Sequence, residues 1–207
     1  MVESTSPDSI RCRLVDAGVA LLDEGGADAV GLRAITRRAG VSHGAPRRHF
    51  PTHRALLAAI ARRGLEDLTQ LLVPILTAPL PDVGNHPGRS GEPAHRLRRA
   101  GQVYVDVAVS RRAMFELMFR HDILDGAGAD LRALSVPLVG ALHEMVIAGL
   151  PDPALPDPDR WARTAGLWTA LHGIAILTAN RTLEPLGAAG AITPGRLIAD
   201  AVDHALR

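Results

Sequence analysis

The sequence predicts an all-α protein of about nine helices, and three observations lead to that prediction. Apolar residues recur at helical spacing along nearly all of the 207 residues, whereas no alternating pattern of useful strand length occurs. Clusters of proline and glycine separate the segments that have this spacing. Two segments also begin with a hydroxyl residue followed by proline, Ser6-Pro7 and Thr193-Pro194, which is a typical helix start.

Several predicted helices have a residue that explains where they start or stop. Gly25 and Gly26 end the first helix, and Gly40 ends the second, because glycine suits the conformation found just past a helix end. Ser42 is expected to cap the third helix, which Pro46 should shorten or distort. In chain order, the predicted helices cover about residues 7–24, 32–39, 43–49, 53–77, 94–110, 112–120, 128–149, 159–182 and 194–206.

The fourth helix and the stretch after it divide the chain. This helix opens at Pro51-Thr52, and Pro74 should kink or end it. Residues 77–95 follow, with four prolines and three glycines. A loop of that length is uncommon inside a compact unit. We therefore interpret it as the join between an N-terminal region and a second set of helices.

Basic residues are concentrated in the N-terminal region. The net charge is only +1, but the segment from Arg33 to Arg54 contains six arginines and no acidic residue. A run of charged residues usually lies on a solvated surface, so a binding role has to be argued from the arrangement of the predicted helices. Two short helices joined by a glycine-containing turn, with a longer helix before them, are the layout of a helix-turn-helix. Its second short helix enters the major groove of DNA. The sequence therefore predicts a DNA-binding surface.

The residues expected to contact DNA lie on or beside this motif. Histidines in the same segment have no acidic or cysteine neighbours, so they are predicted to face DNA or to be half-buried, and neither a metal nor a cofactor is expected. The predicted DNA-binding residues are Arg33, Arg37, Ser42, His43, Gly44, Arg47, Arg48, His49, Thr52 and His53.

One alternative for this segment is catalysis. Residues 40–44 fit G-x-S-x-G, the pattern of a hydrolase nucleophile elbow, with Ser42 as the nucleophile. An elbow needs a strand immediately before the serine. The preceding residues, LRAITRRAG, are instead amphipathic and helical, so no catalytic residue is expected and Ser42 is interpreted as a helix cap.

Aromatic residues gather in the C-terminal region. Five of the six lie between Tyr104 and Trp168, and core packing is the expected role for most of them. Some could line a ligand site, since such sites are mostly apolar with a few polar groups. For His172 two roles stay open: polarising a ligand, or a hydrogen bond inside the core. The candidate ligand pocket is Tyr104, Phe115, Met118, Phe119, Trp168 and His172.

One predicted helix suggests a second subunit. From Thr164 to Ala179 there is no charged residue, so this segment must be covered on every side. A body of this size covers only part of it, and a partner copy is the natural cover for the rest. Together with helix 194–206 it is expected to form half of a four-helix dimer interface. The candidate interface residues are Gly166, Ala170, Gly173, Leu177, Leu197, Ile198, Ala201 and Val202.

Other features of the sequence indicate where in the cell the protein is located. The N-terminus lacks the charged-then-apolar pattern of a signal peptide, and no apolar run is long enough to span a bilayer. We therefore expect a cytoplasmic protein with no membrane partner. The single cysteine, Cys12, excludes an intramolecular disulfide and is predicted to be a small buried residue.

Residues 10–60 resemble the DNA-binding domain of the TetR (tetracycline-repressor) family of bacterial transcription regulators. The resemblance is carried above all by LRAITRRAGVSHGAPRRHFPTHRALLAAI. It implies a helix-turn-helix domain over 1–54, a connecting helix over about 53–77, and a helical effector-binding and dimerisation domain over 55–207. Within the latter, WTALHG (168–173) is similar to the signature of the WHG-type C-terminal subgroup of that family.

Three positions depart from the family's usual pattern. Gly31 stands where a serine or threonine cap is common, and His53 stands where a lysine often begins the fourth helix. Arg47 replaces the aromatic residue, typically a phosphate-contacting tyrosine, of the recognition helix. An arginine can grip a phosphate or read guanine, so the role of the family's tyrosine does not transfer directly.

These expectations combine into one function and two alternatives. The expected function is a homodimeric, ligand-responsive repressor that binds double-stranded, palindromic operator DNA and responds to an unknown small-molecule effector. The first alternative is a helical enzyme with an aromatic pocket, but no paired carboxylates, metal spacing or phosphate loop supports it. The second is an architectural protein that coats DNA with little sequence preference.

Overall fold

The computed structural model describes residues 7–80, 91–124, 126, 128, 130–187 and 192–207, and it is helical with no strand in those residues. The all-α prediction is confirmed. The helices expected from the sequence correspond to α1 (Pro7–Gly25), α2 (Leu32–Ala39), α3 (Ala45–His49), α4 (His53–Thr77), α5 (Gly91–Ser110), α6 (Arg112–Met118), α8 (Arg132–Gly149), α9 (Asp157–Ala179) and α11 (Pro194–Ala205). Three short elements were not predicted: η1 (Ala27–Ala29), α7 (His121–Leu124) and α10 (Glu184–Gly187).

The start of α3 corrects one prediction. Ser42 does not cap this helix; residues 43 and 44 form a turn, and Gly44 is the residue at the N-cap position. Pro46 consequently lies in the first helical turn, where a missing N–H costs no intrahelical hydrogen bond and the fixed φ of proline suits the helix. The helix is short, at five residues, as Pro46 led us to expect.

Other bounds differ from the predicted ones by small amounts. Pro74 lies inside α4, which continues to Thr77 and so does not end at the proline. Helix α5 begins at Gly91, so residues 91–95 belong to a helix and not to the predicted loop. The Ser6 cap and residues 81–90 of that loop lie outside the described residues. The Thr193 cap is confirmed, because its side chain accepts a hydrogen bond from the Arg196 backbone N–H at 3.2 Å.

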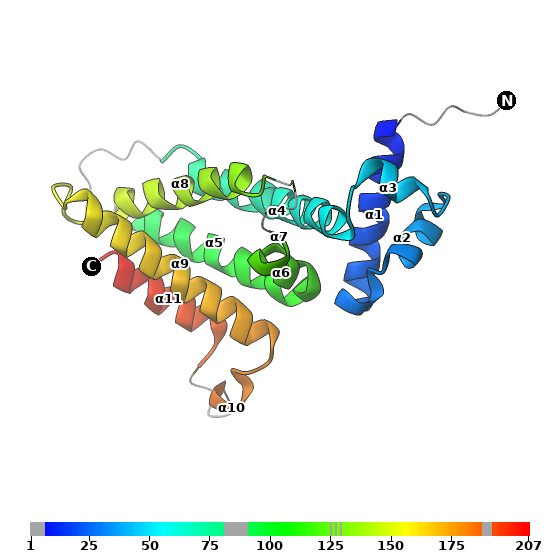
Figure 1. Cartoon of the computed structure of the whole chain (residues 1–207). Coiled ribbons are helices and arrows are strands. Elements are labelled where there is room, and N and C mark those ends of the chain that lie inside the picture. The colour runs from blue at the N-terminus through cyan, green and yellow to red at the C-terminus, as the bar shows by residue number, and fades with distance from the viewer. Residues whose placement is uncertain (1–6, 81–90, 125, 127, 129, 188–191) are drawn as a thin grey trace. The chain divides into compact units, whose positions relative to one another are not determined.

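The chain divides into two compact units. The first contains the residues up to Asp67 together with Arg111–Arg132, and the second contains Leu68–Ser110 and Ala133–Arg207. In Figure 1 the first unit includes α1, α2 and α3, coloured blue to cyan, and the second includes α5, α9 and α11. None of the described helices is long and apolar enough to cross a membrane.

The core of the first unit is built where α1, α2 and α4 meet. Leu14, Ile35, Leu56 and Ile60 are completely buried, and α1 also packs against α3 and α6. Cys12, in contrast, is exposed, so its predicted burial is wrong. It lies on the solvent side of α1, two residues before Leu14, which explains the difference.

Arg111 joins two helices of the first unit at the start of α6. Its Nη2 is 2.9 Å from Asp23 Oδ2 at the end of α1, and its Nη1 is 2.8 Å from Asp67 Oδ2 on α4. Burial alone would lower the pKa of Arg111, but the hydrogen bonds that it donates to both carboxylates outweigh burial and raise it. The guanidinium therefore stays charged and links the start of α6 to the end of α1 and to the middle of α4.

Gly40 makes the turn of the helix-turn-helix possible. It has φ 62° and ψ 39°, in the left-handed region, and a Cβ here would lie 3.1 Å from Arg13 Nη2. We expect Gly40→Ala to lower the free energy of unfolding by about 1–2 kcal/mol, because a Cβ is strained in this conformation. Urea unfolding measures the loss. Gly40→Asn is the control and should lose less, since asparagine tolerates this region; equal losses would contradict the backbone explanation.

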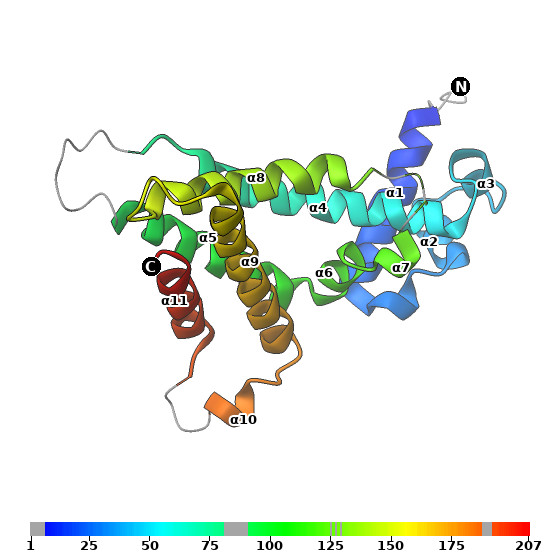
Figure 2. The ribbon, with the colours of Figure 1, turned by 60° about the vertical axis from the view of Figure 1, so that its left-hand side comes forward.

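The second unit is held by close contacts among α5, α9 and α11, which pack pairwise against one another. Gly101 on α5 permits the close approach: a Cβ there would lie 2.8 Å from Ile198 Cγ2 and 2.9 Å from a Leu171 methyl carbon. Both views show α8 beside the C-terminal part of α4 (Figures 1 and 2). Residues of α4, α5, α8 and α9 line a cavity in this unit, which is described below.

Candidate DNA-binding surface and ligand cavity

The two helices of the predicted DNA-binding motif border an open groove in the first unit. Arg33 and Arg47 lie on opposite sides of this groove, one on α2 and the other on α3. The groove is lined by Leu32, Arg33, Thr36, His43, Gly44 and Arg47. Its two arginines give it a positive charge, which suits a phosphate backbone or a guanine edge.

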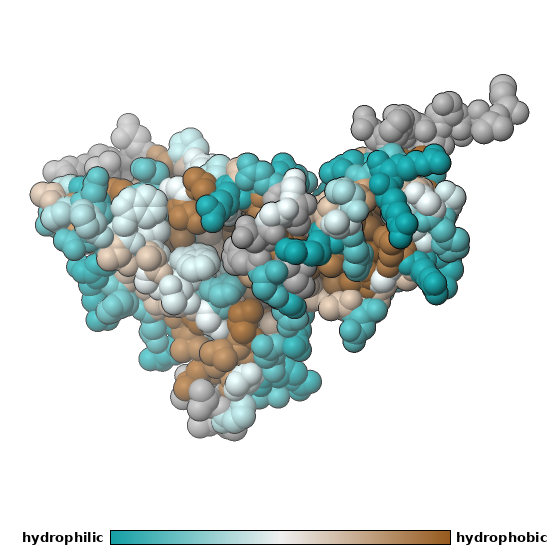
Figure 3. Space-filling view, viewed as in Figure 1, coloured by the Kyte–Doolittle hydropathy of each residue, from teal (hydrophilic) through white to brown (hydrophobic). Residues whose placement is uncertain are grey.

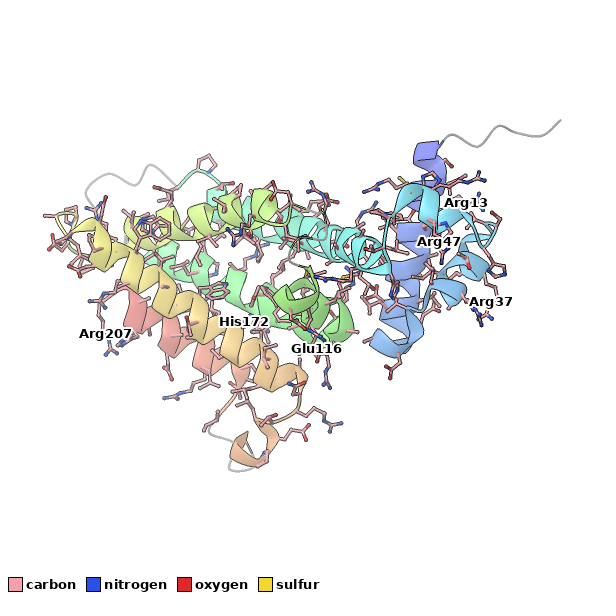
Figure 4. The ribbon with its side chains drawn as sticks, viewed as in Figure 1. Arg13, Arg37, Arg47, Glu116, His172 and Arg207 are labelled. Atoms are coloured by element: carbon pink, nitrogen blue, oxygen red, sulfur yellow. The ribbon has the colours of Figure 1, made fainter. Side chains whose placement is uncertain are left out.

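The arginines of this region fall into two classes. Arg38 is neutralised, since its guanidinium donates two hydrogen bonds, of 2.6 and 2.7 Å, to the Glu24 carboxylate. The exposed arginines of the second class make no hydrogen bond or ion pair within the described residues: Arg33, Arg37, Arg47 and Arg48. Figure 4 shows Arg37 extending outward from α2, with Arg47 on α3. The second class supplies the charge that is free to meet a ligand.

The other predicted DNA contacts lie around the same groove but differ in their bonding. Ser42, His43 and Gly44 are exposed in the turn before α3. Thr52 caps α4, because its Oγ1 accepts a hydrogen bond from the Ala55 N–H at 3.1 Å. His53 is exposed, yet its Nε2 lies 2.9 Å from the Val30 carbonyl oxygen, so one ring nitrogen already has a partner.

Two arginines on α1 position the motif and were missed by the sequence reasoning. Arg13 donates hydrogen bonds to the carbonyl oxygens of Ala39 (2.5 Å) and Gly40 (3.2 Å), at the end of α2. Arg11 donates to the His49 carbonyl oxygen at 3.3 Å, and its guanidinium lies 4.5 Å from the centre of the Phe50 ring. No local pattern in the sequence reveals these roles, since the partners lie 26 to 38 residues away.

The second unit contains an apolar cavity of about 60 Å³. Helices α4, α5, α8 and α9 each contribute to its wall. The lining residues are Leu72, Leu76, Ala100, Gly101, Tyr104, Leu138, Val139, Leu142, Trp168 and Leu171. Such a wall suits the hydrocarbon part of a small molecule.

His172 does not line the cavity itself, but it contacts the two aromatic residues that do, Tyr104 and Trp168. The Tyr104 hydroxyl lies 2.9 Å from His172 Nδ1, and the His172 ring stacks on Trp168 with ring centres 5.5 Å apart. Burial raises the pKa of Tyr104 far above its ordinary value of 10.0, and burial also lowers the pKa of His172 from 6.5. Both side chains are therefore uncharged at neutral pH.

Of the six residues of the predicted pocket, only Tyr104 and Trp168 line this cavity; His172 lies beside them, and the other three lie elsewhere. Phe115, Met118 and Phe119 belong to the first unit and are absent from the cavity wall. Phe115 and Met118 are buried, and the rings of Phe115 and Phe119 are 5.0 Å apart. Their position follows from α6, which packs against α1. Grouping them with Tyr104 in one pocket is therefore wrong for this cavity.

The predicted dimer helix α9 has one buried and one uncovered face in the chain. Its inner face buries Thr164, Leu167 and Leu171, while Trp168 and Leu177 remain 42% and 40% exposed. The space beside Gly166 and Gly173 is open, with no atom within 4 Å of a Cβ built there. Figure 3 shows apolar side chains at the surface over the C-terminal end of α9.

The predicted interface residues on α11 divide into two groups. Ile198 and Val202 are 2% and 0% exposed, because α11 packs them against α5 and α9 of the same chain. They are core residues of the second unit, and their assignment to a dimer interface is corrected. Leu197 and Ala201 are half-buried, so part of each side chain stays at the surface.

His143 is a buried polar residue that the sequence did not single out. Its Nδ1 lies 2.8 Å from Thr164 Oγ1, and its ring stacks on Trp161 with ring centres 3.7 Å apart. The Thr164 hydroxyl in turn donates to the Arg160 carbonyl oxygen at 3.1 Å. These contacts fasten α8 to α9, and they fix the wall that both helices give to the cavity.

Comparison with known families identifies both parts of the chain. Residues 14–60 match the family described as bacterial regulatory proteins, tetR family. Residues 97–200 match the family described as the tetracyclin repressor-like C-terminal domain. No curated protein matches the chain significantly.

Solved structures with the same fold span nearly the whole chain. One is a protein of unknown function from Rhodococcus sp. RHA1, with 25% identity, a TM-score of 0.72, and coverage of 96% of this chain and 94% of that one. A TetR-family regulator from Streptomyces coelicolor has 18% identity, a TM-score of 0.64, and coverage of 96% and 79%. The multidrug binding protein EbrR, in complex with imidazole, has 20% identity, a TM-score of 0.58, and coverage of 100% and 94%.

Proposed function

The chain belongs to the TetR family of bacterial transcription regulators, and from that premise we propose that it is a cytoplasmic, ligand-responsive repressor that binds a palindromic operator as a homodimer. Members of the family are DNA-binding regulators and not enzymes, so the hydrolase interpretation of Ser42 is set aside. The observation that carries the proposal is the groove between α2 and α3, with Arg33 and Arg47 on its two sides.

The charges of this region support specific DNA contacts over a diffuse basic coat. Arg38 is held by Glu24, and Arg13 is held by backbone carbonyl groups. Between residues 33 and 54, the arginines with no hydrogen bond or ion pair to other described residues lie on α2 and α3, the helices that cross the backbone and enter the major groove in a helix-turn-helix. Because these charges lie on only two short helices, they favour binding of the protein in one register on DNA over sliding of the protein along DNA of any sequence.

The operator claim can be tested by binding and selection. Genomic fragments captured by the purified protein should share an inverted repeat with half-sites about one helical turn apart. Affinity for such a fragment should exceed affinity for random DNA by about 1,000-fold or more at a fixed salt concentration. A flat sequence preference with a steep salt dependence would instead support the architectural alternative.

The uncovered face of α9 supports the proposed homodimer. Gly166, Ala170 and Gly173 form a strip of small residues that permits close approach of a second copy, and Leu177 extends the strip. Leu197 and Ala201 lie on the neighbouring α11. An exposed apolar face of this kind is typical of an interaction surface.

We expect Gly173→Trp to produce monomers while leaving the helical content unchanged. The side chain has open space in the chain itself, but it would occupy the volume that a partner helix needs. Light scattering measures the mass, and circular dichroism measures the helix. Gly140→Trp on α8 is the matched control, because that position is also open. A Gly173→Trp protein that stays dimeric would place the interface on another face.

The cavity of the second unit supports the effector part of the proposal. EbrR, which has the same fold, is a multidrug binding protein solved with imidazole and with ethidium. In the proposed mechanism, the effector binds the cavity and favours a spacing of the two DNA-binding regions that no longer fits the operator. Such a shift requires that the effector bind the two states with different affinities.

A further inference from the structure

The first unit contains an open pocket of about 440 Å³, a size that suits a small molecule. Its wall is formed by α1, by the end of α3 and the residues that follow it, by α4, and by two residues that precede α8, Gly128 and Asp130. Its lining residues are distinct from those of the groove between α2 and α3 and from those of the cavity in the second unit. We call it the Arg11–Arg62 pocket, after its two arginines.

Part of this wall is apolar. Phe50, which is 3% exposed, contributes an aromatic ring, and Ala59, which is 9% exposed, contributes a methyl group. Pro51 and Ala55 add further carbon atoms. A phenyl ring or a short hydrocarbon chain placed here would leave water for an apolar surface, which is favourable. The pocket can therefore hold the hydrocarbon part of a ligand.

The rest of the wall is mainly basic. It contains the guanidinium groups of Arg11 and Arg62 and one carboxylate, that of Asp130, so the positive charges outnumber the negative one. A guanidinium has five N–H groups. Within the described residues, Arg11 donates one hydrogen bond, to a carbonyl oxygen, and Arg62 donates two, one of them to the Glu66 carboxylate. The other N–H groups of both arginines are available to a ligand.

Two of these three hydrogen bonds are long. Arg11 Nη1 is 3.3 Å from the His49 carbonyl oxygen, and Arg62 Nη1 is 3.3 Å from the Asp130 carbonyl oxygen. A typical N–H···O bond measures about 2.9–3.0 Å. A carboxylate accepts from a guanidinium more strongly than a neutral carbonyl group does, and it can accept from two N–H groups at once. An anionic ligand therefore offers both arginines better partners than the ones they have.

We propose that the Arg11–Arg62 pocket binds a small carboxylic acid whose carboxylate pairs with Arg11 and Arg62 and whose hydrocarbon part lies against Phe50. This inference goes beyond the proposed function, because the site lies in the unit that contains the helix-turn-helix and requires no ligand in the cavity of the second unit. The apolar part of the wall favours such an acid over a free phosphate ion, and the two arginines favour it over an alcohol.

Three probes separate the contributions of charge and hydrocarbon. Calorimetric titration of the full-length protein at pH 7.5 and fixed salt should show benzoate binding about fivefold or more tightly than benzyl alcohol, since hydrogen bonds to a charged group are the stronger ones. Benzoate should exceed inorganic phosphate by about the same factor, because phosphate has no ring to bury. A smaller advantage over either probe, or no binding of benzoate, would overturn the proposal.

Arg11→Gln and Arg62→Gln test the ion pairs. Each should weaken benzoate about 10-fold, the usual effect of losing a hydrogen bond to a charged group, and change the affinity for benzyl alcohol by less than about twofold. Arg99→Gln is the matched control, because it removes the same charge from an exposed position on α5 that does not line the pocket. Its effect on benzoate should stay below about twofold, since salt screens an exposed charge that makes no contact. Equal losses in all three variants would mean attraction to net charge alone and would refute the site.

Ala55→Leu tests the pocket without removing a charge. Leucine suits a helix nearly as well as alanine does, and its larger side chain would occupy space that the hydrocarbon part of the ligand needs. The affinity for benzoate should fall about 10-fold or more. Circular dichroism and urea unfolding check that the variant folds like the parent. A folded Ala55→Leu protein that bound benzoate with unchanged affinity would place the anion outside the pocket and contradict the proposal.

Discussion

Arg47→Ala is expected to weaken operator binding by about 100-fold. Arg47 lines the groove, is exposed, and has no partner within the described residues, so its full charge is available to DNA. A hydrogen bond to a charged group contributes about 1.5 kcal/mol, and a dimer loses two of them, which corresponds to roughly two powers of ten. For a phosphate contact, the plot of log affinity against log salt also becomes less steep by about 1.8, because two phosphate charges are no longer neutralised.

The matched control uses the arginine that the protein has already neutralised. Replacing the ion pair by Arg38→Gln with Glu24→Gln keeps the net charge and removes an arginine from the same helix as Arg37. Affinity and salt dependence should then change little. If this double variant bound as weakly as Arg47→Ala, the division of the arginines into two classes would be wrong.

The pattern of loss across operator variants assigns the contact made by Arg47. A uniform loss for every sequence indicates a phosphate contact, whereas a loss confined to one base position indicates readout of that base. This is the position where the family usually has an aromatic residue. A base-reading arginine there would therefore give this protein a sequence preference that the resemblance does not supply.

Phe115→Ala is expected to lower the free energy of unfolding by about 3–5 kcal/mol, the usual cost of removing a fully buried ring. Phe115 is 1% exposed within the first unit, where its ring is 5.0 Å from that of Phe119. Denaturant unfolding measures the loss. Phe119→Ala should cost less than half as much, since this ring is only partly buried.

Ligand binding by the Phe115→Ala protein tests whether Phe115 is a core residue or a pocket residue. A protein that still folds at low temperature should bind an effector with unchanged affinity, because Phe115 does not line the cavity. Loss of ligand binding with no change in stability would restore the interpretation of Phe115 as a pocket residue.

Periodicity predicted the helices of this chain well because each buries one apolar side, and the glycines and prolines between them are strong stop signals. The predictions from periodicity are wrong where the role of a residue depends on contacts with residues far away in the sequence. Phe115 and Tyr104 look alike in the sequence, but α6 packs on α1 and takes Phe115 with it. Ile198 and Leu197 are neighbours, yet only Ile198 turns toward Gly101 and becomes core.

For the candidate DNA-binding surface, too, the sequence does not predict contacts between residues that are far apart in the chain. A run of arginines is visible in the sequence, but its division into paired and available charges is not. Glu24, which lies 14 residues earlier on α1, neutralises Arg38, and the local sequence pattern does not predict that contact. Likewise, Ser42 fits the composition of a cap, while the fixed backbone of Pro46 moves the helix start to Ala45.

The two tryptophans of α9 allow ligand binding to be followed by the intrinsic fluorescence of the protein. Each indole stacks on a different histidine ring, Trp161 on His143 and Trp168 on His172, but only Trp168 lines the cavity. A molecule entering the cavity changes the polarity around one fluorophore and leaves the other as an internal reference. Screening for effectors therefore needs no label: the emission of a Trp161→Phe protein reports on the cavity alone.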